Sequence, residues 1–149
     1  YNISSTLIIK LIIDFDIVES MVLMVQKEVA ERLSAEVSTH YYSRLSVLIQ
    51  LHAEVEKVFD VEPHNFNPKP KVKSTVIKIT PYRKKKKIYD KLDYILKISF
   101  RQRRKTIKNN LKTFYIDAEK KIIECAIDPN SRPQDLKPND FIKLSKVLI

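Results

Sequence analysis

Residues 21–35 read MVLMVQKEVAERLSA and indicate the fold class of the chain. The first five residues form an uninterrupted apolar run of strand length, which is typical of a strand buried on both faces within a parallel sheet. A helical pattern begins directly afterwards, because Val29 and Leu33 lie four residues apart among charged neighbours. A strand followed at once by a helix predicts an α/β layer.

Flanking segments extend this layer in both directions. Residues 4–12 repeat apolar side chains at helical spacing behind a serine that can cap the helix, and residues 42–52 repeat them in the same way. Residues 55–61 and 74–79 alternate instead, which predicts two strands. In the second of these strands we expect one better-buried face, with Thr75, Ile77 and Ile79 on it.

The composition of the chain changes near Pro81. A basic run, residues 83–87 (RKKKK), follows this proline, and beyond it the alternating patterns give way to helical ones. We therefore expect two domains, residues 1–82 and residues 83–149. The second should be small and entirely helical.

The net charge indicates the kind of partner. The 149 residues include 28 Lys and Arg against 18 Asp and Glu, a formal net charge of +10. Such a surplus favours polyanions, meaning nucleic acid or an anionic membrane surface. The most apolar run, residues 7–13, contains Lys10 and is followed by Asp14, so it is too short and too charged to span a bilayer. We expect no membrane segment.

Metal and disulfide chemistry is not expected. Cys125 is the single cysteine, which excludes an internal disulfide and fits a reducing cytosol, so we expect a cytoplasmic protein. The three histidines, His40, His52 and His64, fall at no metal-ligand spacing. The chain contains no glycine, so it cannot hold a glycine-rich nucleotide loop.

One loop is a candidate binding element. Residues 65–74 read NFNPKPKVKS, and Pro68 and Pro70 fix their own φ angles and hold the residues before them extended. Phe66 is a large apolar side chain among polar neighbours in this stiff segment, which suggests a stacking surface. The alternative is that Phe66 folds back and caps the edge of a core.

A second candidate surface is basic. Arg101, Arg103, Arg104 and Lys105 lie in a stretch, residues 99–115, that has no acidic residue. Guanidinium groups pair with phosphate in two-point geometry, so contact with a nucleic-acid backbone is the preferred interpretation. A solvated helix face is the alternative.

Five blocks of sequence become informative when they are taken together. They are residues 1–5 (YNISS), 26–33 (QKEVAERL), 42–47 (YSRLSV), 66–74 (FNPKPKVKS) and 100–105 (FRQRRK). In this order and at about these separations they resemble the ribosomal RNA adenine dimethyltransferase family, which includes the KsgA-type enzymes and their Erm relatives. One departure is Ser43, at a position where the family commonly has glycine.

The resemblance implies a specific activity. Such enzymes use S-adenosylmethionine to methylate the exocyclic amine of adenine twice, at adjacent adenines of small-subunit rRNA or, in the Erm branch, in large-subunit rRNA. It also implies that Tyr1 and Phe66 grip the flipped adenine between two rings, a contact worth about 1–3 kcal/mol per base. The cofactor-binding segments of the family would precede Tyr1, so we expect that this chain alone does not bind S-adenosylmethionine.

The implied fold is α/β: the C-terminal half of a Rossmann-like S-adenosylmethionine-dependent methyltransferase sheet, followed by a small all-helical domain. The implied partner is rRNA of the small ribosomal subunit, and the nucleic-acid backbone that the basic surface contacts would be that of this rRNA. The N-terminal half would be a separate polypeptide, or would be missing through truncation or gene loss. Two other hypotheses stay open, namely a non-catalytic RNA-binding remnant that acts in ribosome assembly and an unrelated basic helical protein.

Overall fold

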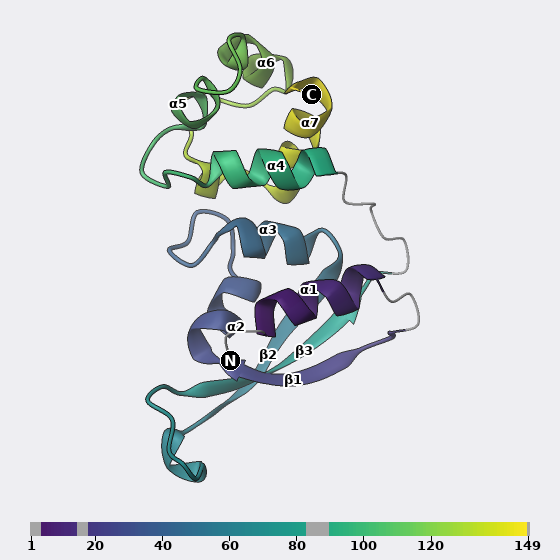
Figure 1. Cartoon of the computed structure of the whole chain (residues 1–149), viewed down its shortest axis with the longest axis vertical. Helices are drawn as coiled ribbons and strands as arrows, with labels where there is room; N and C mark the ends of the chain where they lie inside the picture. Colours follow the sequence, from purple (N-terminus) through teal and green to yellow (C-terminus); the bar gives the residue numbers. More distant parts are fainter. Residues whose placement is uncertain (1–3, 15–17, 83–89, 149) are drawn as a thin grey trace. The chain divides into compact units, whose positions relative to one another are not determined.

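A computed structural model of the chain describes residues 4–14, 18–82 and 90–148. The chain divides into two compact units (Figure 1). The first unit comprises residues 1–35 and 45–86, and the second comprises residues 36–44 and 87–149. The boundary that we expected at residue 83, and the basic run that follows it, lie outside the described residues. The grouping of residues 36–44 with the second unit was not anticipated.

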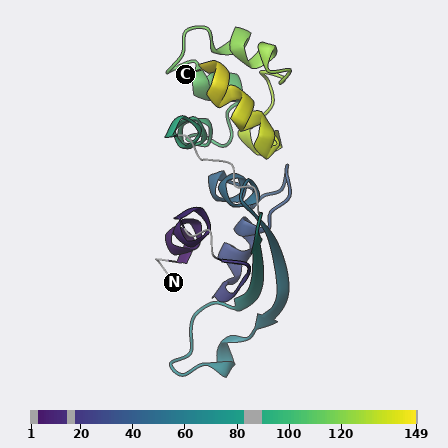
Figure 2. The ribbon, with the colours of Figure 1, turned by 90° about the vertical axis from the view of Figure 1, so that its right-hand side faces the viewer.

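The first unit is a three-stranded sheet with helices on one face. Its strands are β1 (Met21–Gln26), β2 (Ala53–Val61) and β3 (Ser74–Pro81), in the order β1-β3-β2. Both outer strands run antiparallel to β3, so β1 and β2 are parallel to each other. The helices are α1 (Ser4–Asp14), α2 (Lys27–Leu33) and α3 (Arg44–Gln50) (Figures 1 and 2).

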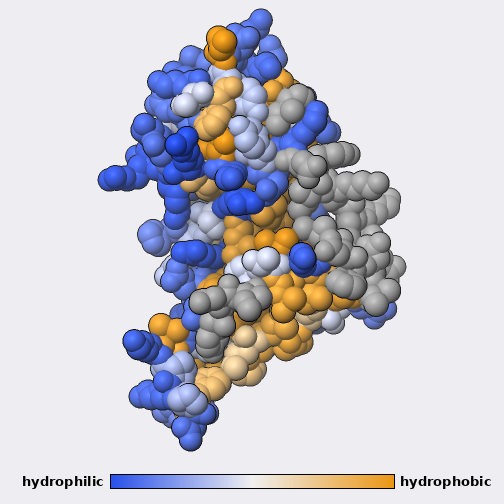
Figure 3. Space-filling view, viewed as in Figure 1, coloured by the Kyte–Doolittle hydropathy of each residue, from blue (hydrophilic) through white to orange (hydrophobic). Residues whose placement is uncertain are grey.

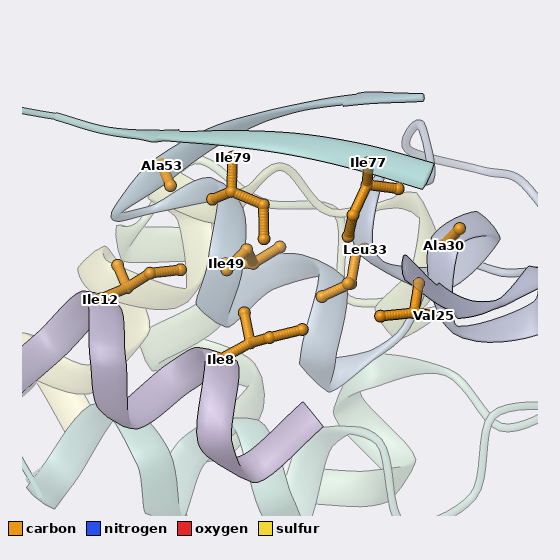
Figure 4. Packing of buried hydrophobic residues seen from close by; sticks show 9 residues of the cluster. All are labelled: Ile8, Ile12, Val25, Ala30, Leu33, Ile49, Ala53, Ile77 and Ile79. Carbon is orange, nitrogen blue, oxygen red and sulfur yellow. The ribbon is translucent and has the colours of Figure 1, made fainter. Parts of the chain in front are cut away.

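The core of this unit lies between the sheet and the helices. Ile77 and Ile79 of β3 are fully buried and face the apolar stripes that the sequence predicted for the helices (Figure 4). Thr75 is buried on the same face, so the predicted face of this strand is confirmed. The other buried members of the cluster are Ile8, Ile12, Val25, Ala30, Leu33, Ile49 and Ala53.

The expectation that β1 is buried on both faces, within a parallel sheet, is wrong for the described residues. Among these, β1 pairs with β3 in antiparallel register, and its side chains alternate between the core and the open face of the sheet. Val22 and Met24 are 66% and 46% exposed. Successive side chains of a strand point to opposite faces of the sheet, whether or not both faces are covered. A continuous apolar run in the sequence therefore does not show whether one face or both faces are buried.

A β-bulge interrupts the alternation that the sequence predicted for β2. Lys57 lies opposite Ile77, but Phe59 lies opposite Val76, so Val58 is the extra residue. Because the side-chain period of a strand is two, this insertion moves every later side chain to the other face. Phe59 is therefore 57% exposed on the open face of the sheet. The residue after it, Asp60, lies opposite Thr75.

The second unit contains helices and, within its described residues, no strand. The helices are α4 (Asp90–Ser99), α5 (Ile107–Leu111), α6 (Ala118–Glu124) and α7 (Pro138–Leu148). A short 3₁₀ turn, η2 (Pro133–Asp135), precedes α7. Thr106 caps α5 by accepting a hydrogen bond from the backbone N–H of Asn109 at 3.3 Å.

Tyr42 explains why residues 36–44 belong to the helical unit. Its side chain is fully buried, and its hydroxyl donates a hydrogen bond to the Leu136 carbonyl at 2.9 Å. The centre of the Tyr42 ring lies 6.4 Å from the centre of the Phe100 ring. The centre of the Phe100 ring lies 5.5 Å from that of the Phe141 ring. Burial raises the pKa of the Tyr42 hydroxyl well above its usual range.

We predict that Tyr42→Phe lowers the free energy of unfolding by about 1 kcal/mol, because the Leu136 carbonyl loses its donor. Since the pKa of Tyr42 is raised in the folded chain, this contribution is present below the unfolded pKa of about 10 and is lost as pH rises above it. Denaturant unfolding of both chains between neutral and alkaline pH measures the difference. Tyr94→Phe, at a side chain of the same unit that is 43% exposed, is the control; an equal loss there would contradict the prediction.

Candidate functional site

The loop that carries Phe66 joins β2 to β3 at the carboxyl end of β2. Val61 of β2 and Gln26 of β1 both lie opposite Ser74, where β3 begins. The carboxyl ends of the two parallel strands and both ends of the loop therefore meet at one edge of the sheet. In open α/β sheets, ligands bind outside this edge. Hydrophilic residues gather where Figure 1 draws this loop, at the lower end of the view (Figure 3).

A polar cluster closes the neck of the loop, which we define as residues 60–62 and 73–75. Asp60 accepts from the Thr75 hydroxyl through Oδ1 at 2.7 Å and from Lys27 Nζ through Oδ2, also at 2.7 Å. The hydrogen bond from Lys27 is the main reason why the pKa of Asp60 lies below its usual value. The same contact raises the pKa of Lys27. The carboxylate is therefore held in its charged form.

Two further contacts lie at the neck. Lys73 and Glu62 form an ion pair at 2.6 Å across the two legs of the loop. The backbone N–H of Lys27, the first residue of α2, donates to the Lys73 carbonyl at 2.9 Å. These contacts join the loop to the β1–α2 junction. From sequence, Lys73 is expected in the candidate loop and Thr75 on the buried face of a strand. The contacts of Asp60 with Lys27 and Thr75 were not predicted, because these residues lie on separate elements.

Phe66 follows a short 3₁₀ turn, η1 (Pro63–Asn65), and its backbone is extended. The N–H of Phe66 donates to the Pro63 carbonyl at 3.3 Å, and the side chain is partly exposed. Phe66 is absent from the core cluster of the first unit. Its proposed partner ring, Tyr1, lies outside the described residues, so the pairing of the two rings stays a prediction.

The predicted basic surface is a turn between α4 and α5. Arg101, Arg104 and Lys105 are exposed on it, and the Arg101 guanidinium lies 5.9 Å from the centre of the Phe114 ring. The buried side chain of Asn110 holds the backbone of the turn. Its Nδ2 donates to the carbonyls of Gln102 and Lys105 at 3.1 and 3.3 Å, and its Oδ1 accepts from the Gln102 N–H at 3.2 Å.

Arg103 differs from its three basic neighbours. Its Nη2 donates to the carbonyls of His40 and Tyr42, at 2.6 and 2.9 Å, and its Nε is buried. These bonds tie residues 36–44 to the basic turn within the helical unit. The guanidinium is thus occupied by an internal contact, which the charge pattern alone could not reveal.

Two classes of site find no support among residues 4–14, 18–82 and 90–148. No group of three or more His, Cys, Asp or Glu side chains is placed to hold a metal ion. No helix in this part of the chain is long and apolar enough to cross a membrane.

Solved structures with a similar fold define the class of the protein. A dimethyladenosine transferase from Plasmodium falciparum matches 97% of this chain and 62% of its own length, with a TM-score of 0.79 and 32% identity. The 23S rRNA methyltransferase ErmE matches 99% of this chain and 62% of its own, with a TM-score of 0.65 and 19% identity. The fold is that of an α/β methyltransferase.

Sequence comparison gives the family. Ribosomal RNA small subunit methyltransferase A of Legionella pneumophila (strain Corby) is 40% identical over 151 residues, and that of Anaplasma phagocytophilum (strain HZ) is 43% identical over 150 residues. The chain spans 58% and 56% of the lengths of these two relatives. The model of the family "Ribosomal RNA adenine dimethylase" matches residues 1–149, and the chain belongs to this family. The family resemblance seen in the five blocks is confirmed.

The contrast between Arg103 and Arg104 can be tested by stability. We predict that Arg103→Ala lowers the free energy of unfolding by about 1–3 kcal/mol, because two backbone carbonyls lose a charged donor. Arg104→Ala is the matched control and should change it by less than about 0.5 kcal/mol, since the side chain is exposed. Denaturant titration of both variants checks this; equal stabilities would exclude the internal role of Arg103.

Proposed function

We propose that this chain is part of an S-adenosylmethionine-dependent rRNA adenine dimethyltransferase of the small-subunit type. The product is an adenine whose exocyclic amine carries two methyl groups, at adjacent adenines. Membership of the family supports this reaction class, and the names of the relatives support small-subunit rRNA as the substrate. The observation that carries the proposal for this chain is a partly exposed Phe66 on a loop anchored at the carboxyl edge of the sheet.

Phe66 would supply a stacking surface for the target base. An adenine taken out of its helix loses its stacked neighbours, and an aromatic ring replaces one of them at about 1–3 kcal/mol per base. Holding the base by its faces leaves the exocyclic amine at its edge free to react. Tyr1 would cover the opposite face. Neither ring exchanges a proton, so their contribution is orientation and the exclusion of water.

S-adenosylmethionine supplies the methyl group in such a reaction. The residues of this chain do not fit a complete site for it, because the chain has no glycine and so cannot form the glycine-rich loop that the family resemblance assigns to the cofactor. We therefore assign target-base and RNA contacts to this chain, and cofactor contacts to the part of the enzyme that it does not span.

The basic turn would hold the RNA backbone. Arg101, Arg104 and Lys105 are exposed in a stretch without acidic residues, and Asn110 fixes the backbone that carries them. Arg103 supports the turn from inside and is not a phosphate contact in this proposal. Contacts of this kind position an RNA without reading its sequence.

The role of Phe66 is tested by substitution in a complete enzyme, formed by joining this chain to the cofactor-binding part of a relative. We predict that Phe66→Tyr and Phe66→Trp keep measurable methyl transfer, because they keep an aromatic face. Phe66→Leu and Phe66→Ala should lose methyl transfer by a factor of order ten or more, as expected for about 1–3 kcal/mol of lost stacking. Phe66→Leu is the decisive control, because it fills space without stacking.

Radioactive methyl transfer to rRNA and thermal melting should be measured on the same samples. Full activity in Phe66→Ala would remove the stacking role. A large fall in melting temperature together with lost activity would return Phe66 to the structural alternative, in which the ring caps a core edge.

The basic turn is tested by the salt dependence of RNA binding. We predict that Arg104→Ala and Lys105→Ala each weaken binding and reduce the slope of log affinity against log salt by roughly 0.7 on single-stranded RNA. Lys120→Ala removes the same charge from α6, where Asp117, Glu119 and Glu124 lie nearby in the sequence, and is the control. If Arg104→Ala and Lys120→Ala change RNA affinity and the salt slope equally, the turn is only a solvated surface and not a specific RNA contact.

A non-catalytic RNA-binding remnant is the second candidate, because the exposed basic turn that Asn110 holds needs no cofactor to contact RNA. The two candidates share the RNA contacts but differ at Phe66. If the chain takes part in catalysis, loss of the aromatic ring at Phe66 should lower methyl transfer even when RNA affinity is unchanged. If the chain only binds RNA, no aromatic ring is required at this position.

A further inference from the structure

We propose that Asp60 is a positioning residue, which fixes the direction of the Phe66 loop by joining both of its legs to the β1–α2 junction. This inference rests on the proposed function, because it assigns to Asp60 the task of holding the base-stacking ring. Asp60 itself touches neither base nor cofactor in this proposal. It acts through the loop.

The β-bulge in β2 gives Asp60 this position. If Val58 were instead paired regularly with Val76, Phe59 would lie opposite Thr75, and Asp60 would lie opposite Ser74 and point to the other face of the sheet. With the bulge, Asp60 lies opposite Thr75, and the hydroxyl of Thr75 reaches Oδ1 at 2.7 Å. Bulges commonly redirect a side chain beside a functional site.

Each oxygen of the carboxylate contacts a different element. Oδ1 holds Thr75, on the leg that leaves the loop, while Oδ2 holds Lys27, at the start of α2. Asp60 is itself on the leg that enters the loop. Three chain segments thus converge on one side chain. The Lys73–Glu62 ion pair and the bond from the Lys27 N–H to the Lys73 carbonyl lie at the same neck.

Stability alone does not account for this arrangement. The side chains of Lys27 and Asp60 are 45% and 39% exposed, and ion pairs at such positions contribute little to folding because water and salt screen them. Their geometric effect is not screened in the same way, since a carboxylate with two fixed partners restricts where both legs of the loop can point. The proposal therefore predicts a change in loop motion with little change in melting temperature.

The test uses the full chain and a fluorescent reporter in place of Phe66. The sequence contains no tryptophan, so Phe66→Trp introduces a single reporter in the loop. Acrylamide quenching and steady-state anisotropy then report how freely the ring moves and how far it is exposed. Each further substitution is made in this background, and its melting temperature is measured in parallel.

Asp60→Ala and Thr75→Val each remove a contact at the neck and should raise the quenching constant and lower the anisotropy. Thr75→Ser keeps the hydroxyl and should preserve both values. Glu31→Gln breaks a comparable ion pair, Lys57–Glu31 at 2.9 Å, which lies between β2 and α2, and should also leave them unchanged. If Asp60→Ala prevents folding, Asp60→Asn and Lys27→Gln remove the charge pair with less disturbance and should show the same rise.

An unchanged quenching constant in all of the neck variants would overturn the proposal, because the prolines alone would then hold the loop. An equal rise in Glu31→Gln would also overturn it, since the effect would not be specific to the neck. No RNA or cofactor is present in this measurement. A failure of the stacking role, seen as full methyl transfer by Phe66→Ala, is therefore distinguishable from a failure of Asp60 as a positioning residue.

Discussion

The antiparallel pairing of β3 with β1 on one side and β2 on the other is the constraint on which the candidate site depends. Because both outer strands run opposite to β3, their carboxyl ends lie at the same edge, where Gln26 and Val61 share Ser74 as partner. The same central strand supplies Ile77 and Ile79 to the core. The register of β3 against its two neighbours is therefore strongly specified. A slip of β3 by one residue would expose both isoleucines and separate Asp60 from Thr75.

Polar side chains with long-range hydrogen bonds play a comparable part in the helical unit. Tyr42 and Arg103 bring residues 36–44 into it, one by donating to the Leu136 carbonyl and the other by donating to the carbonyls of His40 and Tyr42. Asn110 satisfies the backbone of the neighbouring turn in the same way. Tyr42 and Asn110 are buried, and buried polar groups are costly unless they are paired, so these two specify one arrangement of the chain. The exposed basic side chains are carried by a backbone that is already fixed.

Hydrophobic periodicity predicted most of the first unit. The strand–helix alternation, the helix within residues 42–52 and the buried face of β3 all follow from side-chain spacing, which depends only on the local chain. Three features depend on partners distant in sequence, so no local pattern encodes them. They are the open face of β1, the bulge at Val58 and the burial of Tyr42 within the helical unit. Phe66 could be selected because an aromatic ring among prolines and lysines is unusual. Asp60 could not, because its partners Lys27 and Thr75 lie on separate elements.

The absence of glycine illustrates how one compositional fact acts at two levels. For function, it excludes a glycine-rich cofactor loop from this chain. For structure, it leaves other residues to adopt left-handed backbone, and Ser38 and Ala126 do so with φ of 69° and 58°. Ala126 ends α6 in the position that glycine usually takes, at a cost of roughly 1–3 kcal/mol. The bonds from Ala126 N–H to the Ile123 carbonyl and from Ile127 N–H to the Ile122 carbonyl, at 2.8 and 3.2 Å, offset that cost by satisfying the end of the helix. Burial of Ile122 and Ile127 beside these bonds adds an apolar contribution. Tertiary packing can thus replace the conformational freedom of glycine at a helix end, but it cannot replace the missing side chain where a backbone must approach a cofactor closely.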